Sequence, residues 1–78
     1  MYKVYAIKSM NRNYIYVGLT NNLEERLKRH NTGANKTTSP YAPFSLIFVE
    51  NCEDRIHARL REKYFKSGVG KEFLRSIK

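Results

Sequence analysis

The sequence predicts an α+β fold, a small and mainly antiparallel sheet with helices packed on it. Two alternating segments joined by a polar turn open the chain, a third strand-like run lies near its middle, and helical patterns lie between and after them. Elements in the order β-β-α-β-α-α favour this class. Residues 1–78 form one domain, and a chain of this length buries only about 60–65% of its unfolded surface.

The first two strands are expected to form a hairpin. The segments YKVYAIKS and NYIYVGLT alternate and are rich in β-branched and aromatic residues, and MNRN between them supplies turn formers. A turn centred near Asn11 places Tyr5 opposite Tyr16, or one residue out of register, and direct opposition puts both rings on one face. Gly18 then lies near the end of the second strand, where the backbone bends or lets another group approach closely.

The first helix is expected to run from the TNN segment to about Asn31. Asn21 or Asn22 caps its start, two acidic residues in its first turn suit the positive end of the helix dipole, and Gly33 ends it.

Arg26 and His30 lie on one stripe of this helix together with Leu23 and Leu27. Two interpretations are open. In the first, Arg26 extends to solvent and His30 caps the helix end. In the second, the polar half of the stripe faces a cleft and carries chemistry.

The second half of the chain predicts a strand and two helices. FSLIFVE is apolar on both faces, as an interior strand covered on each side would be, and ANKTTSPYAP before it is a loop. NCEDRIHARLREKYFKS is a helix started by Asn51 or Asp54, and GKEFLRSIK allows a third. The apolar arc of the NCEDRIHARLREKYFKS helix holds Ile56, Leu60, Tyr64, Phe65 and Ala58.

Glu62 lies at the margin of that arc, among basic neighbours. Taken alone, it is a solvated partner of Lys66 four residues later, an ion pair that contributes about 0.2–0.5 kcal/mol.

The charge balance predicts a polyanionic partner. The chain holds 15 Lys and Arg against 7 Asp and Glu, a net charge of +8, and the basic residues recur from Lys3 to Lys78. Nucleic acid is the favoured partner. Membrane surfaces and ribosomal RNA attract the same charge, so charge alone does not choose among them.

Several classes of protein lack support in the sequence. The longest apolar run, LIFV, is too short to cross a bilayer, so no membrane role is expected, and the lysines of MYKVYAIKS are untypical of a secretory signal. Cys52 is the only cysteine, which excludes an internal disulfide and favours a reducing, cytoplasmic setting. No zinc-type cluster, phosphate-binding loop, or Ser-His-Asp or Cys-His signature is found.

Five motifs together resemble the GIY-YIG nuclease superfamily. They are Tyr5 in KVY, the YVG that starts at Tyr16, Arg26 and His30 four apart, and Glu62 in ARLREKYFK. Their order and spacing match, and HNTG, PFSLIFVE and KYFKSGVGKEFL extend the resemblance over nearly the whole chain. The chain is similar to the compact single-domain bacterial group, which resembles the excinuclease N-terminal domain.

This resemblance implies a GIY-YIG fold, with a three-stranded antiparallel sheet flanked by helices and a shallow cleft onto which the five side chains point. It implies a divalent-metal-dependent endonuclease that hydrolyses nucleic-acid phosphodiester bonds, primarily those of DNA, with one metal ion. Glu62 would hold Mg²⁺ or Mn²⁺, and Arg26 would stabilise charge on phosphorus. Tyr5 would activate the attacking water, with its phenol pKa lowered from about 10 by nearby cations. Tyr16 would position water or phosphate, and His30 would orient Tyr5 or share the proton transfer.

Arg29, Lys36 and Lys66 are the expected nucleic-acid contacts. Characterised relatives attach this module to a separate DNA-binding domain or partner, so an accessory protein is expected to supply specificity to a monomer or weak dimer. Two alternatives stay open. One is a non-catalytic DNA- or RNA-binding module on the same fold, and the other is a subunit interaction protein with an incidental basic surface.

Overall fold

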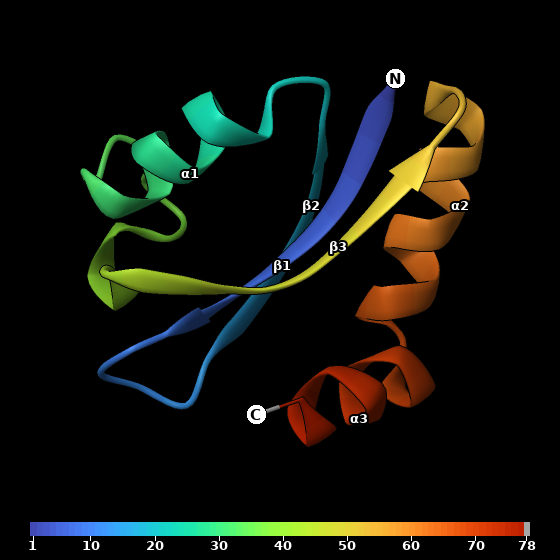
Figure 1. The fold of residues 1–78 in the computed structure, drawn as a ribbon. Coiled ribbons are helices and arrows are strands. Elements are labelled where there is room, and N and C mark those ends of the chain that lie inside the picture. Colours follow the sequence, from blue (N-terminus) through green and yellow to red (C-terminus); the bar gives the residue numbers. More distant parts are fainter. Residues whose placement is uncertain (78) are drawn as a thin grey trace.

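The computed structural model describes residues 1–77, so Lys78 at the end of the predicted third helix lies outside the described residues. The elements follow the predicted order (Figure 1). They are β1 (Tyr2–Ser9), β2 (Ile15–Thr20), α1 (Leu23–Asn31), a 3₁₀ turn (Ser39–Tyr41), β3 (Phe44–Cys52), α2 (Arg55–Lys66) and α3 (Gly68–Ser76). The predicted α+β class is confirmed. None of the helices within residues 1–77 has the length and apolarity that a bilayer crossing requires.

The sheet has three antiparallel strands in the order β2-β1-β3. The prediction that FSLIFVE forms an interior strand was wrong, because β1 is central and β3 lies at an edge. The segment is apolar on both faces for another reason. Ile47 and Phe48 pack on one hydrophobic cluster and Phe44 on another, while Leu46 and Val49 remain 42% and 37% exposed.

The hairpin register differs from the predicted one. Tyr5 lies opposite Gly18, and Tyr16 lies opposite Ile7, so the pairing is two residues away from direct opposition of the tyrosines. The hydrogen bond from the Ser9 backbone N–H to the Tyr14 carbonyl, at 2.9 Å, fixes this register and centres the turn between Asn11 and Arg12. A shift of two residues keeps both tyrosines on the same face, and their ring centroids are 6.4 Å apart.

The two faces of the sheet pack against different helices (Figure 1). On one face, α2 and α3 cover a buried cluster formed by Val4, Ala6, Ile15, Val17, Cys52, Ala58, Phe65 and Leu74. On the other face, α1 covers a smaller cluster formed by Tyr5, Ile7 and Phe44. Because α1 and α2 lie on opposite faces, their side chains can form a common site only beyond the margin of the sheet.

Local signals place α1 as predicted. The Asn22 side chain accepts a hydrogen bond from the Glu25 backbone N–H at 3.2 Å, which satisfies one of the free donors at the helix start. The helix ends at Asn31, and Gly33 takes the left-handed conformation, with φ of 78°, that glycine adopts without strain.

The rotation of α2 was predicted only in part. Ala58 and Phe65 are buried, but Ile56, Leu60 and Tyr64 are 74%, 60% and 42% exposed, so three of the five residues of the expected apolar arc face solvent. Two tertiary contacts turn the helix this way. Arg61 on α2 binds Glu50 on β3 through two hydrogen bonds of 2.6 and 3.0 Å. Gly70 on α3 packs directly on the backbone at Phe65.

Candidate active site

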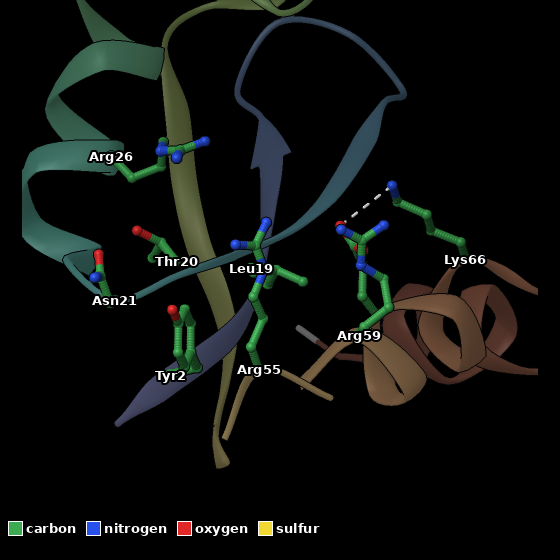
Figure 2. Close-up of a pocket in the computed structure, with 9 residues that line it drawn as sticks. Tyr2, Leu19, Thr20, Asn21, Arg26, Arg55, Arg59 and Lys66 are labelled. Carbon is green, nitrogen blue, oxygen red and sulfur yellow. Dashed lines mark ion pairs between the residues drawn. The ribbon is translucent and has the colours of Figure 1, made fainter. Parts of the chain in front are cut away.

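A cleft of about 450 Å³ opens between α1 and α2, past the end of β2 (Figure 2). Arg26 reaches into it from α1, and Arg55 and Arg59 reach into it from α2, so that guanidinium groups flank both sides. The complete lining is Tyr2, Leu19, Thr20, Asn21, Arg26, Arg55, Arg59, Glu62 and Lys66. Four basic side chains therefore surround a single carboxylate.

Glu62 is the carboxylate of this cleft, and its side chain is 15% exposed. Its oxygens lie 3.4 Å from the Lys66 ammonium and 3.8 Å from the Arg59 guanidinium. The predicted ion pair with Lys66 is confirmed.

The donor set fits a divalent ion that the substrate helps to hold. No group of three or more His, Cys, Asp or Glu side chains within residues 1–77 could form a closed metal site. Mg²⁺ does not need one, because it commonly keeps several waters and binds one or two carboxylates together with substrate phosphates. Glu62 at the wall of an open cleft matches that chemistry.

Tyr5 and His30 form a buried pair beside the cleft. The Tyr5 hydroxyl lies 2.8 Å from His30 Nε2, and both residues are 0% exposed. His30 therefore does not cap α1 in the way that one interpretation of the sequence proposed. The half-buried Tyr16 joins the pair, with its ring centroid 4.9 Å from that of His30. All five predicted residues thus gather in one region, but only Arg26 and Glu62 line the cleft itself.

The electrostatics of this pair differ from the expected pattern. Burial raises the pKa of the Tyr5 phenol well above its ordinary value, and the nearby Tyr16 and Glu62 raise it further. Arg26 opposes them by its charge and by hydrogen bonding, but burial dominates. The expected lowering of the Tyr5 pKa by a nearby cation is present, but burial outweighs it, so the prediction of a lowered pKa was wrong. Burial, with a smaller effect of Arg26, lowers the pKa of His30 and thus favours the neutral imidazole.

Gly18 makes room for the Tyr5 phenol. A Cβ atom at this position would lie 2.6 Å from the Tyr5 hydroxyl oxygen and 3.0 Å from the Tyr16 ring. The close approach that was expected at Gly18 is therefore made by the two tyrosines of the candidate site.

The three expected nucleic-acid contacts lie in different places. Lys66 lines the cleft. Arg29 is on an exposed part of α1, 3.9 Å from Glu25, and Lys36 is exposed on the loop that follows α1. Neither Arg29 nor Lys36 is among the residues that line the cleft.

Three residues of the region were not predicted from the sequence. Arg55 and Arg59 share a helical stripe with Glu62 and Lys66, at positions i, i+4, i+7 and i+11, and this spacing was a usable signal. Thr38 is 0% exposed, and its hydroxyl lies 2.9 Å from His30 Nδ1. It had no sequence signal, because loop residues follow no periodic pattern.

The fold and the site define a class of protein. Residues 1–74 match the model of the GIY-YIG catalytic domain, and the chain belongs to this family. No solved protein structure resembles the chain closely enough to count as a match.

Among curated proteins, the chain is similar to members of the UPF0213 group. It is 41% identical to a UPF0213 protein of Clostridium perfringens over 64 aligned residues, and this alignment covers 81% of this chain and 68% of that protein. It is 38% identical to the UPF0213 protein YazA of Bacillus subtilis over 63 aligned residues, and this alignment covers 80% of this chain and 63% of YazA. The matches thus span about two thirds of the relatives' lengths.

Proposed function

We propose that this protein is a divalent-metal-dependent endonuclease that hydrolyses phosphodiester bonds of nucleic acid, primarily DNA, with a single metal ion. One observation carries the proposal, namely that Arg26 of α1 and Glu62 of α2 line the same cleft. The hydrogen-bonded Tyr5 and His30 lie next to it, near enough to Arg26 for the guanidinium to shift the pKa of both. Membership of the GIY-YIG catalytic domain family supports the same conclusion.

The charge of the cleft suits a polynucleotide backbone. Arg26 lies on one side, and Arg55, Arg59 and Lys66 lie on the other (Figure 2). A strand that crosses the cleft can place neighbouring phosphates against both sides, because guanidinium groups pair well with phosphate oxygens. The four cations outnumber the one carboxylate, so phosphate binding does not require a metal ion.

Each predicted site residue has a role in this proposal. Arg26 stabilises the charge that develops on the phosphoryl oxygens, for which its planar and permanently charged group is suited. Glu62 holds Mg²⁺ or Mn²⁺, which, when bound, neutralises the scissile phosphate and assists the leaving oxygen. Tyr16 positions the phosphate or the attacking water. Tyr5 takes the proton of that water, and its own proton passes to His30, its partner at 2.8 Å.

A second candidate function is a DNA- or RNA-binding module without turnover. The burial of Tyr5 favours it, because the phenol oxygen that would activate the attacking water is closed to solvent. The basic cleft alone is sufficient for binding. Target choice by an accessory protein, and action as a monomer or weak dimer, are compatible with either function.

The test is cleavage of supercoiled, branched and single-stranded DNA by the purified protein with Mg²⁺, with Mn²⁺ or with EDTA. We expect nicking that disappears with EDTA and in the Glu62→Ala and Tyr5→Phe variants, with the fold checked by circular dichroism. Glu72→Ala is the matched control, since Glu72 is exposed on α3 and does not line the cleft.

The outcomes separate the two functions. Unchanged cleavage by a folded Glu62→Ala variant would exclude the proposed mechanism. If no DNA is cut, but all are bound with a steep salt dependence, the binding module is the correct function.

A further inference from the structure

Thr38 is a buried residue that the proposed chemistry has not used. It lies on the loop after α1, is 0% exposed, and places its hydroxyl oxygen 2.9 Å from His30 Nδ1. The same hydroxyl lies 3.5 Å from the backbone carbonyl oxygen of Asn35. Tyr5, His30, Thr38 and Asn35 thus form one continuous chain of hydrogen-bonding groups.

The direction of these hydrogen bonds follows from what each group can donate. The Tyr5 hydroxyl is closed to solvent, its hydrogen-bond partner among the described residues is His30 Nε2, and the nearest cation is the Arg26 guanidinium. Arginine has no acceptor atom, so the phenol proton can only be donated to Nε2. A neutral imidazole carries one N–H, which must then be on Nδ1. That N–H donates to Thr38, whose own proton goes to the Asn35 carbonyl.

We propose that Thr38 is a positioning residue that holds His30 as the Nδ1–H tautomer, so that Nε2 can receive the proton of Tyr5 during phosphodiester hydrolysis. This inference rests on the proposed function, although the tautomer can be measured without any activity. The opposite tautomer would direct an N–H at the phenol oxygen. It would leave the buried Tyr5 proton without an acceptor, which is energetically unfavourable.

The proton transfers balance in this arrangement. The attacking water forms its bond to phosphorus and gives its proton to the Tyr5 oxygen, while the original Tyr5 proton moves to His30 Nε2. The bond from phosphorus to the leaving oxygen breaks with its electron pair on that oxygen, which takes a proton from solvent. His30 is then an imidazolium whose Nδ1–H still donates to Thr38, and it later returns its extra proton to solvent.

The experiment measures the tautomer by long-range proton–nitrogen NMR on the ¹⁵N-histidine-labelled protein, above the titration range of histidine. A His57→Gln sample assigns the signals, because the sequence holds only 2 histidines. The variants are Thr38→Val, which removes the hydroxyl at nearly constant shape, and Thr38→Ser, which keeps it. Thr37→Val is the matched control, because Thr37 is the exposed neighbour of Thr38.

We expect the wild type, Thr38→Ser and Thr37→Val to show the Nδ1–H pattern, and Thr38→Val to shift toward Nε2–H. In cleavage assays, Thr38→Val should lower kcat by about 10-fold to about 100-fold, as the loss of an orienting partner commonly does. KM should stay unchanged, because Thr38 does not line the cleft. Thr38→Ser should restore most of kcat.

An Nε2–H pattern in the wild type overturns the inference whether or not the protein cleaves DNA. So does a folded Thr38→Val variant with the wild-type tautomer and the wild-type kcat. If Thr38→Val does not fold, the wild-type spectrum and the Thr38→Ser variant still decide. A wild type with the Nδ1–H pattern that cuts no nucleic acid refutes the proposed function, and with it the catalytic use of the tautomer, but leaves the hydrogen-bond assignment standing.

Discussion

Substitution of Gly18 by alanine should disturb the candidate site without altering any polar group. The added Cβ would lie 2.6 Å from the Tyr5 hydroxyl oxygen, whereas ordinary contacts begin at 3.4 Å, so the phenol oxygen must move by about 0.8 Å. A movement of that size would break the 2.8 Å hydrogen bond to His30 or force the strand backbone apart. Overpacking of a buried position costs about 1–3 kcal/mol, and a misplacement near 1 Å at a reacting group can lower kcat by about 100-fold.

The assay combines urea unfolding with single-turnover nicking of supercoiled DNA. Gly68→Ala is the control, because a Cβ at Gly68 on α3 meets nothing within 4 Å. Its stability should stay the same or rise by up to about 1 kcal/mol, with unchanged cleavage. Gly18→Ala should also cost less stability in a Tyr5→Phe background, because the nearest clashing atom is then missing. Wild-type stability together with wild-type turnover in Gly18→Ala would refute the packing of Tyr5 against Gly18.

The remaining predictions concern pH and charge. Burial lowers the pKa of His30, so the unfolded chain takes up this proton at higher pH than the folded chain. The contribution of neutral His30 to the free energy of unfolding is therefore fully present above the ordinary histidine pKa and is lost as pH falls. Urea midpoints from about pH 7 to about pH 5 should fall more steeply for the wild type than for His30→Gln, and equal slopes would contradict the assignment. DNA binding should persist in EDTA, and Arg55→Gln and Arg59→Gln should each reduce the slope of log K against log salt by roughly one. Arg75→Gln, outside the cleft, should leave the slope unchanged, and an equal effect of all three would show that only net charge matters.

Local chemistry made much of the fold predictable from sequence. Asn22 caps α1 and Asp54 caps α2 through their own side chains, and Gly33 follows the end of α1 in a left-handed conformation. These signals act over three or four residues, so no knowledge of the rest of the chain is needed. The alternating strands and the motif residues were found in the same way.

The tertiary structure decided which elements and side chains are neighbours. The apolar content of FSLIFVE could not distinguish an edge from an interior strand, because strand order depends on which edge of β1 each partner takes. Likewise, Ile56 is as apolar as Phe65, and only the contacts of α2 with β3 and α3 decided which of them is buried.

The candidate site shows the same division. The sequence by itself determined which five side chains are present, at spacings that resemble a nuclease family, and it determined the basic charge. Only the tertiary structure separated a pair that lines the cleft, Arg26 and Glu62, from a buried pair, Tyr5 and His30. It also placed Thr38 against the imidazole. Burial and hydrogen-bond partners belong to the folded chain as a whole, so the proton positions and pKa values of the site are set by packing across segments distant in sequence.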